Sequence, residues 1–145
     1  MGTGDKVVAM RAEGTFTVKS FVPASVEPPF EVTTAAPAGV ATMEKSFEGE
    51  IEGRSATLFT ASYDQARGIG TYVAMESFEG GVAGREGTFA FAHSATTTGS
   101  DASNQFFVIV PGSGTGDLAG ITGSGGIAID EDGTHRIWFE YGFGD

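Results

Sequence analysis

The stretch SFEGEIEGRSATLF at residues 46–59 returns as SFEGGVAGREGTFAF at residues 77–91, and a degenerate third copy, GDLAGITGS, occupies residues 116–124. In each copy two glycines four positions apart flank one aliphatic residue, which is Ile51, Val82 or Leu118 in turn. Glycine adopts positive φ angles and therefore lets a chain bend sharply between strands. The repeat predicts three corners between antiparallel strands, each plugged by its aliphatic residue against the end of the core.

The rest of the chain extends this pattern into a sheet of many strands. DEDG at residues 130–133 is typical of a hairpin turn, and the proline-rich stretch 22–39 predicts a long connection with a short extended piece at 30–35. Mostly short links between strands favour a single all-β domain over residues 1–145, an eight-stranded up-and-down β-barrel whose closure removes exposed edges, with a loose segment at 1–11. From alternation and β-rich composition we expect its strands at 14–21, 40–53, 55–63, 71–80, 87–96, 104–110, 123–130 and 135–143.

The composition narrows the classes of partner that the chain can have. Its 145 residues are 40% hydrophobic and include 12 Phe, enough for one folded domain with a sizeable core. The formal net charge of -11 and the scattered Lys and Arg residues disfavour nucleic acid and anionic membrane surfaces as partners. No apolar run has the length of a signal peptide core or a membrane span, so we expect a cytoplasmic protein.

Motifs for metal ions and cofactors are missing from the sequence. The chain has no Cys, and His93 and His135 are too few for a multi-histidine metal site. PGSGTG at residues 111–116 lacks the lysine of a P-loop, DEDG is too short for a calcium loop, and no Ser stands in a G-x-S-x-G motif. We therefore expect neither a metal ion nor a cofactor.

Several segments, taken in order, resemble a bacterial domain-of-unknown-function family. They are GTFTVKSF (14–21), EKSFEGEIEGRS (44–55), GTYVAMESFEGGVAGREGTFAFAHS (70–94), VPGSGTGDLAGITG (110–123) and HRIWFEY (135–141). The resemblance covers about residues 12–143 and implies an eight-stranded barrel similar to that of allene oxide cyclase. The family brings no activity with it. Barrels of related fold include plant allene oxide cyclases and bacterial cyclases of natural-product pathways, which is an analogy of fold.

Strand alternation selects two titratable residues as candidates for catalysis. Glu76 shares a face of its strand with Tyr72 and Phe78, and His93 shares a face with Phe89 and Phe91. If those faces point inward, burial would raise the pKa of Glu76, which could then act as a general acid or base with His93 as its partner. The alternatives are a carboxylate at the surface or paired with Arg85, and a histidine satisfied by backbone groups at a strand end.

Further residues are candidates for contacts with a ligand. Trp138 and Glu140 share one face of the last strand, and would offer a flat surface and a charge if that face lined the interior. The alternative is a Trp packed in the core with Glu140 at the rim. Glu44 and Lys45 lie on opposite faces, so only one can point inward, and we choose Glu44. The complete set of expected ligand-binding residues is Tyr72, Phe78, Phe89, Phe91, Trp138, Glu140 and Glu44.

These observations favour a barrel that binds a small, largely apolar molecule in its interior. Our leading hypothesis is a cofactor-independent cyclase or isomerase that holds an unsaturated substrate in a reactive conformation. The alternatives are a carrier of a small hydrophobic ligand and a structural barrel that only supports contacts between subunits. Several strands carry apolar residues on both faces, which leaves the inward face open and is compatible with a homodimer or homotrimer.

Overall fold

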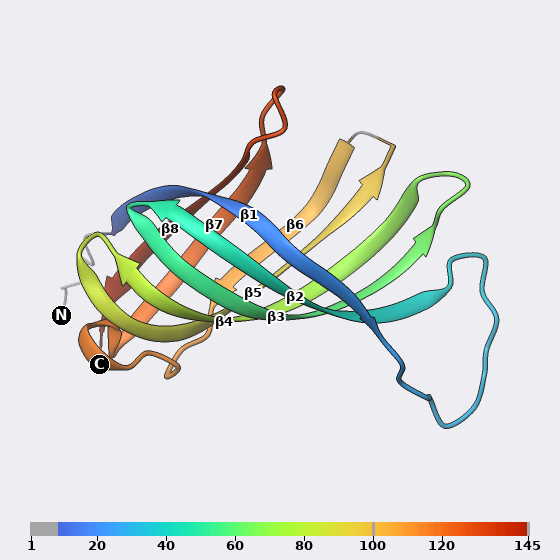
Figure 1. Cartoon of the computed structure of the whole chain (residues 1–145), viewed down its shortest axis with the longest axis horizontal. Helices are drawn as coiled ribbons and strands as arrows, with labels where there is room; N and C mark the ends of the chain where they lie inside the picture. The colour runs from blue at the N-terminus through green and yellow to red at the C-terminus, as the bar shows by residue number, and fades with distance from the viewer. Residues whose placement is uncertain (1–8, 100, 145) are drawn as a thin grey trace, which may run out of the picture.

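In the computed structural model, which describes residues 9–99 and 101–144, eight antiparallel strands form one sheet that closes into a ring (Figure 1). Each strand pairs with the next, and β8 pairs with β1. Residues 1–8 of the expected loose segment 1–11 lie outside the described residues, whereas Met10 and Arg11 already belong to the first strand. The strands are β1 (Met10–Ala24), β2 (Ala38–Gly49), β3 (Ile51–Asp64), β4 (Ile69–Val82), β5 (Arg85–Thr98), β6 (Asp101–Ile109), β7 (Ile121–Ile129) and β8 (His135–Phe143).

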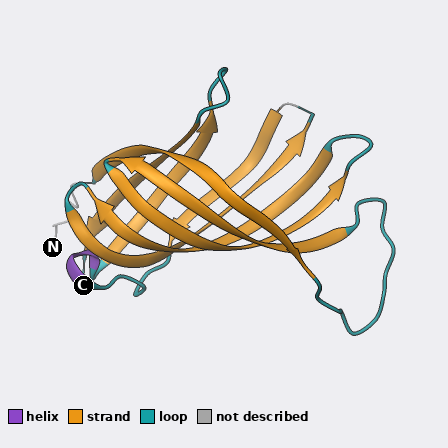
Figure 2. Cartoon of the chain, viewed as in Figure 1, coloured by secondary structure: helices purple, strands orange, loops and turns teal. Residues whose placement is uncertain are grey.

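The strand boundaries follow the sequence prediction with two corrections. The strand expected at 135–143 coincides with β8, and the others overlap β1–β7. The strand expected at 40–53 is too long, because the chain turns at Gly49 and β3 begins at Ile51. The extended piece expected at 30–35 is not a strand and belongs to the loop between β1 and β2. The one helical element of the described residues is the three-residue 3-10 turn η1 (Gly116–Leu118), coloured purple in Figure 2, so no helix there is long and apolar enough to cross a membrane.

The repeated glycine corners gather at one end of the ring and close it. The prediction that they use positive φ is confirmed, and Ile51, Val82 and Leu118 are fully buried as plugs of that end. The third copy differs, because η1 begins at its first glycine, Gly116, and ends before the second, Gly120. Adjacent corners touch: a Cβ atom on Gly53 would lie 2.2 Å from the carbonyl oxygen of Glu79. The corner glycines, with φ from 61° to 151°, are Gly49, Gly53, Gly80, Gly84, Gly116 and Gly120.

Side chains on the inner face fill the closed end of the ring. Alternate residues of each strand point inward, and at this end they are aromatic or aliphatic, so their burial supplies the hydrophobic stabilisation of the fold. Edge-to-face ring contacts also link strands that are not paired, as between Phe47 of β2 and Phe78 of β4. The core consists of Ala12, Phe16, Phe47, Ile51, Phe78, Val82, Phe89, Phe91, Ile109, Leu118, Ile121, Ile137, Phe139 and Tyr141.

The opposite end of the ring is less closed. There the long loop between β1 and β2 extends from the sheet, and β6 diverges from the hairpin of β7 and β8 (Figure 1). The only pair of Cα partners between β6 and β7 in the described ranges is Ile109 with Gly123. On the outer face, Leu58 and Met75 are cross-strand neighbours, and with Val73 and Phe106 they leave large apolar side chains exposed. The expected homodimer or homotrimer stays a prediction.

Candidate functional site

A buried cluster of polar side chains lies on the inner face, just above the aromatic core. Glu76 of β4 is completely buried, and its carboxylate accepts hydrogen bonds from side chains of three other strands. Lys45 Nζ and His93 Nε2 each lie 2.5 Å from Oε2, and Ser55 Oγ donates to Oε1 at 2.8 Å. The cluster joins β2, β3, β4 and β5, because the antiparallel register places these inward-facing positions at one level of the ring.

Tyr72 extends this cluster toward the open end. Its hydroxyl lies 2.8 Å from Nδ1 of His93, so that Tyr72, His93 and Glu76 form a continuous hydrogen-bonded chain. The Tyr72 ring stacks on Phe59, with centroids 5.5 Å apart and planes at 14°. The imidazole of His93 lies nearly parallel to the ring of Phe107, with centroids 5.7 Å apart. These ring contacts fix the orientation of the Tyr72 and His93 rings.

The protonation state of Glu76 in this hydrogen-bonded network differs from the sequence prediction. Burial raises the pKa of Glu76, but the hydrogen bond from His93 and the positive charge of Lys45 outweigh it, so the pKa lies below its usual value. The expected rise is therefore wrong, and Glu76 is ionised at neutral pH. Burial, with a smaller contribution from the Glu76 charge, raises the pKa of Tyr72 to about 12, so its hydroxyl keeps its proton. Because an ionised carboxylate only accepts, His93 Nε2–H donates to Glu76.

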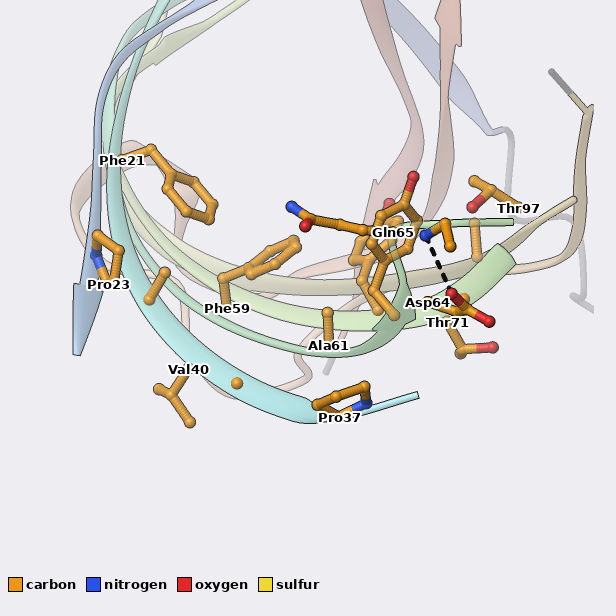
Figure 3. Close-up of a pocket in the computed structure, with 17 residues that line it drawn as sticks. Phe21, Pro23, Pro37, Val40, Phe59, Ala61, Asp64, Gln65, Thr71 and Thr97 are labelled. Carbon is orange, nitrogen blue, oxygen red and sulfur yellow. Dashed lines mark hydrogen bonds between the residues drawn. The ribbon is translucent and has the colours of Figure 1, made fainter. Parts of the chain in front are cut away.

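A cavity of about 760 Å³ lies at the open end (Figure 3). Its walls come from β1 to β5 and are mainly apolar. Phe21 and Phe59 turn their rings into it, with an edge-to-face contact at 5.7 Å between centroids. Tyr72 also lines this cavity, so the hydrogen-bonded chain that begins at Glu76 ends at its wall. A volume of this size suits a small organic ligand.

Three of the expected ligand-binding residues do not line the interior. Glu44 and Glu140 are exposed on the outer face, where Glu140 accepts a hydrogen bond from Arg11 Nη1 at 2.9 Å. Trp138 also lies outside, with the guanidinium of Arg11 5.2 Å from its ring centroid, and it borders a smaller cleft between β6 and β7. The inner face of β8 carries Phe139 and Tyr141 instead. Those three assignments to the interior are wrong because the apolar residues on both faces of β8 concealed its direction.

The other expected residues do point inward, at two different levels. Phe78, Phe89 and Phe91 are buried in the core at the closed end, where they fill space rather than border the large cavity. Tyr72 alone of the expected ligand contacts borders that cavity. Glu76 and His93 come together as expected, and their catalytic roles stay predictions.

Three residues of the cluster were not predicted from the sequence: Lys45, Ser55 and Thr57. Lys45 rather than Glu44 faces inward, and the signal was present, since Lys45 alternates with two apolar residues, Met43 and Phe47. Arg85, which the sequence offered as an alternative partner of Glu76, lies elsewhere, with its guanidinium 4.4 Å from the ring centroid of Phe143.

Thr57 adds an unpaired polar atom to the cluster. It is 2% exposed and is the Cα partner of Glu76 across β3 and β4. Among the described residues its Oγ1 is the one buried side-chain polar atom without a hydrogen-bond partner. A buried hydroxyl without a partner is costly unless water or a ligand satisfies it. The described residues, 9–99 and 101–144, contain no group of three or more His, Asp or Glu residues arranged to hold a metal ion.

Residues 12–141 match the family described as "Protein of unknown function (DUF3224)". This chain belongs to that family. A protein of unknown function from the DUF3224 family of Shewanella oneidensis MR-1, known from a crystal structure, is similar to it with a TM-score of 0.82 and 28% sequence identity. The likeness covers 94% of this chain and 98% of the Shewanella chain. Among curated proteins, none matches this chain.

Proposed function

We propose that the protein binds a small, largely apolar, unsaturated molecule in the cavity at the open end and isomerises or cyclises it without a cofactor. The observation that carries the proposal is the position of Tyr72, which borders the cavity and is hydrogen-bonded to the buried His93–Glu76 pair. We further propose that the closed sheet is a barrel of the allene oxide cyclase type. Its eight antiparallel strands in one ring support this comparison.

The proposed chemistry is a proton transfer that leaves no net change in the enzyme. In the proposed step His93 carries protons on both ring nitrogens, with Nε2–H donating to Glu76 and Nδ1–H donating to the Tyr72 oxygen. Tyr72 donates its hydroxyl proton to a ligand oxygen on which negative charge develops, and the Nδ1 proton of His93 moves to the resulting phenolate, which leaves a neutral imidazole. The Glu76 carboxylate stabilises the imidazole while its charge changes, and Lys45 keeps that carboxylate ionised. When the product forms, the protons return along the same hydrogen bonds. The walls of the cavity would favour reactive conformers of a flexible substrate.

A carrier without catalysis is the second candidate. Glu76 accepts three hydrogen bonds and does not border the cavity, as expected for a group with a structural role. In this case the cluster only holds four strands together. The cavity binds a hydrophobic molecule and releases it without a chemical reaction. The two candidates therefore differ in the role of the Tyr72 hydroxyl.

The substitution Tyr72→Phe separates these candidates, because it removes the hydroxyl and keeps the ring on Phe59. Binding is measured with the neutral dye 1-N-phenylnaphthylamine, and conversion with a panel of unsaturated epoxides and enones followed by chiral chromatography. We expect Tyr72→Phe to bind the dye like the unmodified protein and to lose conversion by roughly a hundredfold, the size typical of a lost general acid. Dye binding without conversion in either protein would support the carrier. Absence of dye binding would contradict both.

A further inference from the structure

The closed sheet has a gap between β6 and β7, and β6 carries a local backbone distortion along this gap. Asn104 has a φ angle of 51°, in the left-handed region that residues other than glycine seldom adopt. The pairing of β5 with β6 shifts register beside it, between Ser94 and Thr96. Such a bulge bends a strand. β6 leaves β7 after the pair Ile109–Gly123, and the two strands diverge in Figure 1. Strained backbone of this kind is often retained for function.

The gap holds a cleft of about 610 Å³. Its inner part is bordered by His93 and Phe107, and its outer part by Phe106 and Trp138. Gln105, which follows the strained Asn104, also borders the cleft and supplies an exposed amide. The cleft therefore passes through the sheet, from the outer surface to the buried imidazole of His93.

The cleft and the large cavity share part of their walls. Tyr72, Ala95 and Thr97 border both of them. Ala95 is the residue of β5 at which the register with β6 shifts, so the distortion lies at the shared wall. The hydroxyl of Tyr72, hydrogen-bonded to His93, thus lies where the two spaces meet.

The charges along both walls indicate the class of ligand. No Asp, Glu, Lys or Arg of the described residues borders the cleft, and the one carboxylate bordering the cavity, Asp64, is paired with Arg67 Nε at 2.7 Å. The whole chain carries a net charge of -11, which would repel an anion. Walls that are largely apolar and carry no unpaired charge, and that meet at the Tyr72 hydroxyl and the His93 imidazole, suit a neutral molecule with few hydrogen-bonding groups.

We propose that the cleft between β6 and β7 is a second arm of the ligand site. One elongated, neutral, largely apolar molecule runs from the large cavity past Tyr72 into the cleft, with a carbonyl or hydroxyl group at Tyr72 and one apolar end beside Gln105. This inference rests on the function proposed above and adds to it the length and charge of the ligand.

The test is displacement of 1-N-phenylnaphthylamine by linear methyl ketones of increasing length, from about eight to about fourteen carbon atoms, in which each buried methylene strengthens binding by roughly fourfold. The protein is compared with Gln105→Trp, which fills the cleft, and with Gln105→Leu, which removes the amide at similar size. Ala61→Trp, in the wall of the large cavity only, is the matched control. Gln105 is exposed, so its variants are expected to fold, and circular dichroism checks this.

In the unmodified protein and in Gln105→Leu, affinity should rise with chain length. In Gln105→Trp the affinity for long ketones should fall by at least about tenfold, because the loss of only two buried methylenes accounts for that factor. The affinity for short ketones should be unchanged. Ala61→Trp should weaken short and long ketones alike. Long ketones that bind Gln105→Trp as tightly as the unmodified protein would overturn the second arm and leave the proposed function standing. If neither dye nor ketone binds the unmodified protein, the proposed function fails, and the inference with it.

Discussion

At the scale of single residues, the molecule is unusual in holding an ion pair inside an otherwise aromatic interior. Lys45 and Glu76 are both almost fully buried, and their charges are compensated by each other and by His93 and Ser55. A buried pair of this kind contributes little to stability by itself, but removal of one partner leaves an uncompensated charge. The side chains that surround the pair therefore determine which substitutions the fold tolerates.

Lys45→Met should destabilise the protein by about 3 to 5 kcal/mol, because the Glu76 carboxylate then stays buried without its cation. The double variant Lys45→Met with Glu76→Leu should recover much of that loss, since no buried charge remains. Urea unfolding measures both, with the exposed Lys19→Met as a control expected within about 0.5 kcal/mol. Additive losses in the double variant would show that the two groups do not interact.

Acid should weaken the fold partly through Glu76. Because the pKa of Glu76 in the folded protein lies below its usual value, the group stabilises the fold above the unfolded pKa of about 4.3 and stops doing so as pH falls through the folded pKa. The urea midpoint of the unmodified protein should consequently fall between neutral pH and about pH 3 more than that of Glu76→Gln. Parallel pH profiles of the two proteins would mean that Glu76 is not held ionised.

Alternation along single strands predicted part of this cluster. Glu76 lies between Ala74 and Phe78 on one face, and two apolar neighbours on that face indicate from the sequence alone a carboxylate that points inward. Its partner was not predictable in this way, because the pairing of Lys45 with Ser55, and of Ser55 with Phe78, depends on the register between strands. Register is a property of the assembled sheet and is only weakly written in one strand.

At the scale of elements, the repeated corners explain why the closed end of the ring is so compact. The backbones of neighbouring corners approach each other at Gly53 and Gly80, which are Cα partners. A Cβ atom on Gly80 would lie 2.1 Å from the carbonyl oxygen of Glu52, so no larger residue fits without displacement of the backbone. The repeat in the sequence thus reflects a steric requirement that recurs at successive hairpins.

Gly53→Ala should therefore destabilise the protein by about 2 kcal/mol or more, as a Cβ atom would clash with Glu79 and the φ angle of 144° is unfavourable for alanine. Gly39→Ala is the matched control, because that glycine also lies in a strand and has nothing within 4 Å of an added Cβ. Thermal unfolding of the two variants checks this expectation. Equal midpoints would contradict the steric account of the repeat.

The corners were also the part of the fold that the sequence predicted best. Paired glycines around one aliphatic residue indicated both the turns and the buried plugs. The pattern is local, because the glycines adopt positive φ and the aliphatic residue between them is buried. The bulge at Asn104 carries no comparable signal, since asparagine occurs in many loops and its positive φ depends on the neighbouring strand. The gap beside β6 was consequently missed.

At the scale of the whole molecule, one end of the ring is filled and the other is open. The filled end contains the aromatic core, and the open end contains the cavity and the cleft, with the polar cluster between them. Local stability should follow this division, because strands with few partners open more readily than strands paired on both sides. Rigid support on one side and accessible space on the other is a common arrangement in ligand-binding sites.

Hydrogen exchange should reveal this asymmetry. Amides at 101–107 of β6, which lack pairing with β7, should exchange faster than those at 54–60 of β3, which is paired on both sides. Mass spectrometry of peptic fragments measures both regions in one experiment, and added methyl ketone should slow exchange in β6. Uniform protection across the two regions would mean that the gap closes in solution.

The most direct test of ligand binding at the open end is a crystal structure of the protein with a bound linear methyl ketone. We predict the ketone oxygen within hydrogen-bonding distance of the Tyr72 hydroxyl and its alkyl chain against Phe59 in the large cavity. Density for the ketone only on the exposed apolar surface around Leu58 and Met75, with the cavity free of it, would contradict the proposed site.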